Sequence, residues 1–88
     1  MRKLKDNYGN SVEEISRTTL LYKTFDNKKY EIGCETSVGP LFILSIYANT
    51  LREWEESDLF TTSEDKKKSI ILSIKEMCEA KNIRVEIV

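Results

Sequence analysis

The last third of the chain, from Thr61 to Val88, carries the pattern that most constrains the fold. Apolar residues recur there at helical spacing and then change to a two-residue alternation. The helical stripe consists of Ile70, Ile71, Ile74, Met77 and Cys78, and the alternation consists of Ile83, Val85 and Ile87. The first spacing gives a helix one apolar stripe, and the second gives a strand one apolar face. The sequence therefore predicts a long helix that lies on a sheet and is followed directly by a strand.

Signals at both ends set the limits of this helix. Thr61 and Glu64 have the spacing of a capping box, in which the hydroxyl accepts a hydrogen bond from an unpaired amide and the carboxylate reaches back. Asn82 tolerates the left-handed backbone conformation that ends a helix. We therefore expect a helix from Glu64 to Lys81.

Three strands are predicted ahead of this helix. Thr18 to Phe25 is rich in β-branched and aromatic residues, and Lys29 to Glu35 alternates apolar with polar or small residues. Asp26 to Lys28 gives a tight turn, so these two strands should form an antiparallel hairpin. Leu41 to Tyr47 is almost continuously apolar, which is typical of a central strand. The predicted fold class is α+β, an antiparallel sheet of about four strands in the order β-β-β-α-β with the long helix packed on one face.

The remaining segments have weaker signals. A chain of 88 residues predicts a single domain. Met1 to Asn10 is polar and basic, and we expect a loose tail that ends in a turn. Ser11 and Glu14 fit either a capping box on a single helical turn or an early strand. Asn49 or Thr50 is expected to cap another short helical turn before the long helix.

Residue usage argues against most kinds of catalysis. The sequence has no histidine, the most common general base and the usual partner of a nucleophilic serine or cysteine. Its three glycines are too scattered for a phosphate-binding loop, and two cysteines without histidine do not make the usual zinc site. The run Lys66 to Lys68 fits either a phosphate-binding cluster or a solvated helix face. We expect no enzymatic activity, no metal and no cofactor.

Net charge and hydropathy narrow the range of partners and compartments. The formal net charge of −1 predicts no preference for nucleic acid or for an anionic membrane. No apolar run is long enough to span a bilayer, and no secretory signal follows the basic N-terminus. Cys34 and Cys78 are expected to be buried free thiols, because a disulfide needs close Cα atoms and an oxidising compartment. We therefore expect a cytoplasmic protein.

One stretch has an uneven charge. Between Glu53 and Asp65 the sequence has six acidic residues and no basic one, and Trp54 and Phe60 lie among them. This pattern fits an acidic rim around partly exposed aromatic anchors, which would suit a basic partner. It also fits a solvated surface whose aromatic residues belong to the core under the long helix. On the first interpretation the partner-binding residues are Glu53, Trp54, Glu55, Glu56 and Asp58.

Three tyrosines fall in predicted strands. Tyr30 shares a strand face with Ile32 and Cys34, so we expect it in the core. Tyr22 and Tyr47 have the opposite parity to strongly apolar neighbours, so we expect them on the surface of the sheet. An exposed tyrosine pair would be a second candidate contact surface.

The order of these elements and certain residues resemble small bacterial immunity proteins, which are encoded beside polymorphic or contact-dependent toxins. The resemblance spans Arg17 to Val88. It rests on the hairpin from Leu20 to Glu35, the strand Leu41 to Tyr47, the segment Ser45 to Glu55 that ends in Trp54 and Glu55, the helix Glu64 to Lys81 and the strand Ile83 to Ile87.

The resemblance implies a cytoplasmic, non-catalytic protein that binds one cognate toxin domain and blocks its active site. Toxins of these systems are often nucleases with basic clefts, which would suit the acidic stretch. One alternative is a small interaction or scaffold domain, such as a homodimer through an exposed sheet edge. Another is a small enzyme or ligand-binding domain with a concave pocket.

Overall fold

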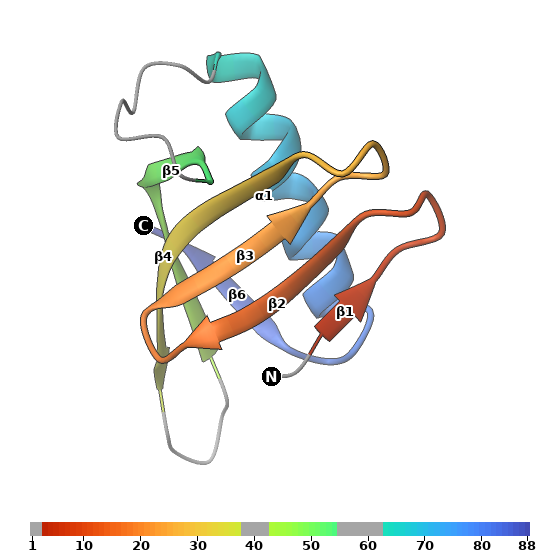
Figure 1. Cartoon of the computed structure of the whole chain (residues 1–88). Helices are drawn as coiled ribbons and strands as arrows, with labels where there is room; N and C mark the ends of the chain where they lie inside the picture. The colour runs from red at the N-terminus through yellow and green to blue at the C-terminus, as the bar shows by residue number, and fades with distance from the viewer. Residues whose placement is uncertain (1–2, 38–42, 55–62) are drawn as a thin grey trace.

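The computed structural model describes residues 3–37, 43–54 and 63–88. These residues form one helix and a curled sheet of six strands, whose spatial order follows the chain (Figure 1). Neighbouring strands are antiparallel except for β5 and β6, which run parallel. The elements are β1 Lys3–Lys5, β2 Ser11–Ser16, β3 Thr19–Lys23, β4 Lys29–Ser37, β5 Ile43–Glu53, α1 Glu64–Glu79 and β6 Arg84–Ile87.

The predicted α+β class and the single long helix are confirmed, but the predicted sheet of about four antiparallel strands is wrong in two respects. Two strands, β1 and β2, precede the predicted hairpin, so Ser11 and Glu14 belong to a strand and not to a helical turn. The sheet is mixed because α1 lies between β5 and β6 in the sequence. A helix that crosses the sheet returns the chain to the end where the previous strand began, so the two strands run in the same direction.

Strand β1 lies within the first ten residues, which the sequence predicts to be a loose tail. Leu4 packs against the core, and the Asp6 carboxylate accepts hydrogen bonds of 2.9 Å from the amides of Tyr8 and Asn10. Gly9 supplies the positive φ of this turn, 91°. Desolvation acts to raise the pKa of Asp6, but the hydrogen bonds from Asn10, Tyr8 and Gly9 outweigh it and lower that pKa. The turn chemistry of this short segment thus positions β1 beside β2.

Helix α1 carries the predicted apolar stripe, except that Ile71 is only partly buried, and it ends at Glu79, two residues before the predicted Lys81. Its N-cap is Ser63, whose hydroxyl accepts a hydrogen bond of 3.2 Å from the amide of Lys66. Thr61, which the sequence predicts for this role, lies outside the described residues. Asn82 adopts a left-handed φ of 60°, as predicted. The helix residues that are buried are Ile70, Ile74, Met77 and Cys78.

The concave face of the sheet and α1 enclose the core. The helix contacts β1 and β2 at one end of the sheet and β5 and β6 at the other, so the sheet curls around it (Figure 1). Outward side chains alternate with the inward ones along each strand. The fully buried sheet residues are Val12, Leu20, Tyr30, Ile32, Leu44, Ile46 and Leu51.

Strand β5 extends through the segment in which the sequence predicts a short helical turn. Glu31 pairs with Arg52, and Gly33 pairs with Tyr47. A single residue separates these positions on β4, whereas residues 48–51 separate them on β5. The extra residues form a bulge, which breaks the ladder locally and bends the strand.

The side chain of Thr50 bridges β4 and β5 where their backbone pairing is interrupted. Its hydroxyl accepts a hydrogen bond of 2.7 Å from the amide of Gly33 and donates one of 2.7 Å to the carbonyl of Tyr47. The turn-forming character of Asn49 and Thr50 is therefore real, but it produces a bulge within a strand and not a helix. The prediction failed because the hydrogen-bond partner of Thr50 lies on another strand, 17 residues away.

Candidate binding surfaces

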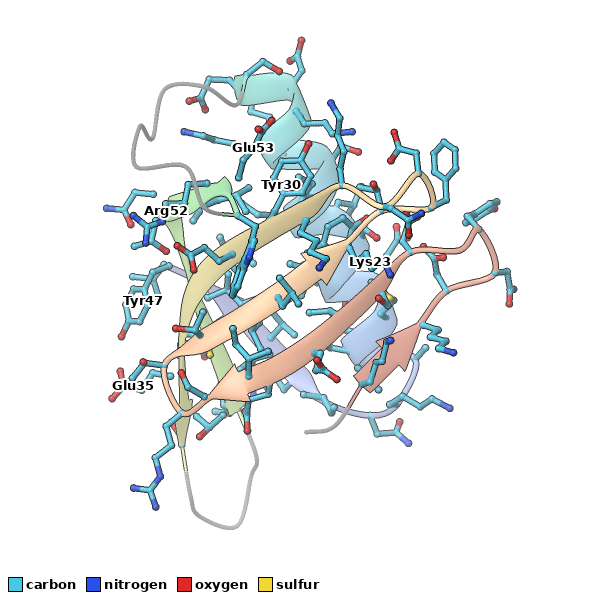
Figure 2. All side chains as sticks on the ribbon, in the orientation of Figure 1. Lys23, Tyr30, Glu35, Tyr47, Arg52 and Glu53 are labelled. Carbon is cyan, nitrogen blue, oxygen red and sulfur yellow. The ribbon has the colours of Figure 1, made fainter. Side chains whose placement is uncertain are left out.

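Two of the five predicted partner-binding residues lie in the described part of the chain, at the end of β5. Trp54 is 36 % exposed and is not part of the core, so the interpretation that it packs under the helix is wrong. Its amide donates a hydrogen bond of 2.9 Å to the carbonyl of Lys29, which fixes it beside the start of β4. Glu53 is half-buried and faces Tyr30 across the ladder (Figure 2). The other three, Glu55, Glu56 and Asp58, lie outside the described residues.

The surface around Glu53 carries both signs of charge. Lys28 and Lys29 line the same shallow depression of about 340 Å³ as Glu53 and Trp54. Burial raises the pKa of Tyr30, and the negative charge of Glu53 raises it further, so the carboxylate lies near this ring. The described part of the predicted site therefore offers one partly exposed aromatic side chain in a mixed electrostatic setting.

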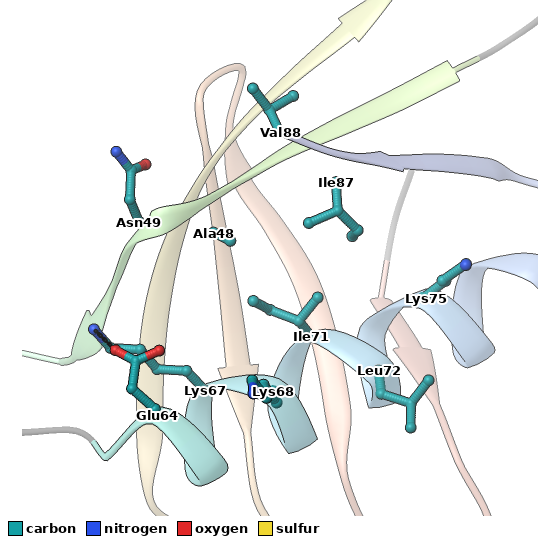
Figure 3. A pocket seen from close by; sticks show the side chains of 10 residues that line it. All are labelled: Ala48, Asn49, Glu64, Lys67, Lys68, Ile71, Leu72, Lys75, Ile87 and Val88. Carbon is teal, nitrogen blue, oxygen red and sulfur yellow. Dashed lines mark ion pairs between the residues drawn. The ribbon is translucent and has the colours of Figure 1, made fainter.

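A larger hollow, which sequence analysis missed, runs between α1, the middle of β5 and the end of β6 (Figure 3). Its volume is about 750 Å³. Ile71 points from the helix towards Ala48 and Ile87 across the groove (Figure 3). Ile87 in β6 is 45 % exposed, so α1 leaves this part of the concave face uncovered. Leu72 on α1 is 56 % exposed. We call this hollow the α1 groove.

Lysines border the α1 groove. Lys67, Lys68 and Lys75 line it together with one acidic residue, Glu64. The Lys67 ammonium lies 3.7 Å from the Glu64 carboxylate, whereas Lys68 and Lys75 form no ion pair with any residue that the structure describes. Lys66 does not line the groove, so the predicted lysine run divides between two surfaces. The signal that could have identified the groove is Leu72, an apolar residue beside the buried stripe.

A second groove, of about 550 Å³, lies on the opposite flank of α1 against the turn between β1 and β2. It is lined by residues of both charges, Lys5 and Lys81 with Asp6 and Glu76. The charged residues that line it are thus two acidic and two basic ones. The α1 groove differs from this second groove because most of its charged lining residues are positive.

The convex face of the sheet has no helix over it among the described elements. Tyr47 donates a hydrogen bond of 2.6 Å to the Glu35 carboxylate, which raises the pKa of Tyr47, and Arg52 forms an ion pair with Glu31. Figure 2 shows Glu35, Tyr47 and Arg52 pointing away from α1. Gly33 lies between these pairs and adds no side chain. The polar groups on this part of the face are thus largely paired with each other.

The three tyrosines only partly match their predicted positions. Tyr30 is in the core as predicted, and Tyr47 is on the surface as predicted. Tyr22 is buried, which contradicts the expected surface position, and its hydroxyl donates a hydrogen bond of 3.0 Å to Ser73 on α1. The pair of adjacent leucines before Tyr22 obscured the parity of β3, because Leu20 faces inward and Leu21 faces outward. The predicted exposed tyrosine pair therefore does not exist.

Both cysteines are buried and not disulfide-bonded, as predicted. Desolvation by burial raises the pKa of Cys34 from 9.0 to about 11, and the charge of Glu14 adds to this effect. Burial likewise raises the pKa of Cys78 to about 11. Both side chains are therefore neutral thiols at physiological pH, a state that is a poor nucleophile and a poor metal ligand.

The described residues include no group of three or more cysteine, aspartate or glutamate side chains that could hold a metal ion. Within the same residues, no helix has the length and apolar character needed to cross a membrane. Searches against protein-family models, curated proteins and solved structures give no match. The function is therefore argued from the surfaces described above and from the resemblance.

Proposed function

We propose that this chain is a non-catalytic binding protein that neutralises a bacterial toxin in the manner of an immunity protein. The observation that carries the proposal is the exposure of Trp54 at the end of β5. A tryptophan outside the core that is anchored to a sheet by its backbone is a typical hot-spot residue of a protein interface. The resemblance supplies the class of partner, and the acidic residues next to Trp54 in the sequence supply a charge that suits a basic cleft.

The proposed mechanism is steric block. The sheet holds Trp54 in place, so little conformational entropy is lost when it inserts into the toxin. The acidic residues that follow Trp54 in the sequence would accelerate encounter with a basic active-site cleft, and the aromatic contact would slow dissociation. The immunity protein acts in the cytoplasm, where the toxin would meet its target.

Co-expression tests the proposal directly. The product of the gene immediately upstream is produced in cells with and without this chain, and growth is recorded. We expect the neighbour to arrest growth and this chain to restore it, and the two purified proteins to form a stable complex. A harmless neighbour, or a toxic one that this chain does not counteract, would remove the basis of the proposal.

Variants then test the surface. Trp54→Ala should weaken the complex about thirtyfold, the effect of losing about 2 kcal/mol at a hot spot. The double change Glu55→Lys with Glu56→Lys should slow association with the toxin, and the rate should fall further at lower salt concentration. The matched control is Glu76→Lys with Glu79→Lys, exposed acidic residues near the far end of α1. Equal effects of the two double changes would exclude this face as the contact.

The homodimer alternative lacks a specific supporting observation. Both edge strands of the described sheet are short, three residues in β1 and four in β6. The exposed side chains of β1 are lysines, and β6 carries Arg84 and Glu86. Short, charged edges are how natural proteins prevent pairing between sheets.

A further inference from the structure

We propose that the α1 groove binds an acidic amphipathic helix of a partner protein. This inference goes beyond toxin neutralisation and does not depend on it, because the α1 groove is distinct from the Trp54 surface. It rests on three observations: an exposed apolar floor, a lysine rim and the spacing of that rim along α1.

The floor of the groove has the character of a contact surface. Ile71 points from α1 into the groove, towards Ala48 and the half-exposed Ile87 (Figure 3). Leu72, also about half exposed, lies at the edge of this groove and borders the second groove as well. Apolar side chains that gather within a polar rim mark an interaction site more often than scattered exposed ones.

The rim determines the charge of the occupant. Three lysines line the groove, and a single glutamate, Glu64, opposes them. Glu64 is engaged with Lys67, so Lys68 and Lys75 are left to interact with an incoming negative charge. Carboxylates are the complementary groups that a protein partner would supply.

The spacing determines the form of the occupant. Lys68 and Lys75 are seven residues apart on α1, which is two helical turns or roughly 10 Å. Ile71 lies on the turn between them and faces into the groove. A helix packed along α1 would match this surface if its acidic residues were seven apart with apolar residues at the intervening i+3 and i+4 positions.

A membrane surface fits these observations less well. Recognition of anionic lipid headgroups uses clusters of about four to eight basic residues. The groove has two lysines that are not paired within the described residues. Acidic residues also lie at this end of α1, Glu64 in the groove lining and Asp65 next to it in the sequence. Two positive charges along the α1 wall, with Ile71 between them, suit a helix with few carboxylates.

Fluorescence anisotropy with synthetic peptides tests the inference. The probe is a labelled helical peptide of about fourteen residues, in which leucines at i+3 and i+4 are flanked by glutamates at i and i+7. Its twin has lysine in place of each glutamate. We expect the full chain to bind the acidic peptide and not the twin. Binding of neither peptide, or equal binding of both, would overturn the proposal.

Charge reversal locates the binding. Lys68→Glu with Lys75→Glu should weaken binding of the acidic peptide at least tenfold, because two favourable pairs become repulsive. The matched control is Lys66→Glu with Lys81→Glu, exposed lysines outside the groove, and we expect it to bind within twofold of the wild type. Unchanged binding by the groove variant, or equal losses in both variants, would place the peptide elsewhere and refute the inference.

Two further measurements complete the test. Ile87→Ser should weaken binding of the acidic peptide while thermal unfolding shows an intact fold, because Ile87 is about half exposed and lines this groove but not the second one. Vesicles of anionic phosphatidylglycerol serve as the competing ligand. Vesicle binding that requires Lys68 and Lys75, without peptide binding, would assign the groove to a membrane and overturn the proposal. No toxin is present in these experiments, so their failure is independent of the result of co-expression.

Discussion

The contact between Gly33 and Thr50 depends on the absence of a side chain at residue 33. A Cβ atom there would lie 2.9 Å from Thr50 Oγ1, closer than real contacts allow. The hydroxyl cannot withdraw without losing its hydrogen bonds to Gly33 and Tyr47. We therefore expect Gly33→Ala to lower the free energy of unfolding by about 1–3 kcal/mol, measured by urea denaturation.

A double-mutant cycle separates this contact from a general effect on strand β4. Thr50→Ala removes the hydroxyl and the methyl group that the new Cβ would meet. In that background Gly33→Ala should lower the free energy of unfolding by much less than it does in the wild type. Equal costs in both backgrounds would show that Thr50 is not the cause.

The buried thiol of Cys34 makes stability sensitive to alkaline pH. Burial raises its pKa in the folded chain to about 11, against 9.0 for an unperturbed thiol. A raised folded pKa means that the stabilisation is complete below pH 9 and is lost as the pH rises from about 9 to 11, because the unfolded chain ionises first. Wild type should therefore lose about 1 kcal/mol more than Cys34→Ala between pH 8 and pH 10.

Urea denaturation under reducing conditions at a series of pH values measures this difference. Burial also raises the pKa values of Tyr22 and Tyr30, but both tyrosines are present in wild type and variant, so their effect cancels. Parallel pH profiles for the two proteins would contradict the assignment.

Single-residue predictions from sequence succeeded where the cause is local. Asn27 and Asn82 have left-handed backbone conformations, φ 68° and φ 60°, because the asparagine side chain tolerates them. The prediction for Tyr22 failed because burial depends on which elements lie opposite. Tyr22 is buried by α1 through Ser73, a residue 51 positions away in the sequence.

At the scale of elements, the start of α1 depends on Ser63. Its hydroxyl satisfies the Lys66 amide, one of the orphan donors at the helix N-terminus. Ser63→Ala should lower the free energy of unfolding by about 1 kcal/mol. Ser69→Ala, an exposed position inside the same helix, is the matched control and should be neutral or slightly stabilising. Equal losses in the two variants would contradict the capping role.

The apolar stripe of α1 supplies a second prediction at this scale. Ile74 is fully buried against the sheet, so Ile74→Asp places an unpaired charge in the core and should unfold the domain. Ile74→Ala leaves a cavity and should cost about 2–5 kcal/mol. Leu72→Asp, two residues away but exposed, should remain folded by circular dichroism and thermal melting. A cooperative native-like melt for Ile74→Asp would refute this packing.

Elements were predictable from the sequence where their apolar pattern extends over many residues. The stripe of α1 runs from Ile70 to Cys78, about two and a half turns, and the hairpin of β3 and β4 has both alternation and an Asp-Asn turn. Strand β1 is three residues long, too short for a period, and its position depends on the hydrogen bonds of Asp6. The groove has no periodic signal, because its walls come from α1, β5 and β6 together.

At the scale of the whole molecule, the two sheet edges predict a monomer. Lys3 and Lys5 are exposed on the edge strand β1, where charge discourages pairing with another sheet. We expect light scattering to give the monomer mass at every concentration tested. Lys3→Thr with Lys5→Thr should increase association, whereas Lys66→Thr with Lys81→Thr should not. A concentration-dependent mass for the wild type would favour the homodimer alternative.

The parallel pairing of β5 with β6 has a consequence for synthesis of the chain. Strands β1 to β5 pair with their sequence neighbours, whereas Ile43 pairs with Arg84, across the whole of α1. At about 5–20 residues per second, the ribosome needs roughly 2–7 s to add residues 54–88 after β5 is complete. Until α1 has been added and has left the ribosome, any pairing among β1 to β5 leaves the apolar concave face without its helix. Chaperones that bind exposed apolar surface therefore have a defined moment at which to engage the nascent chain, and it ends when α1 docks.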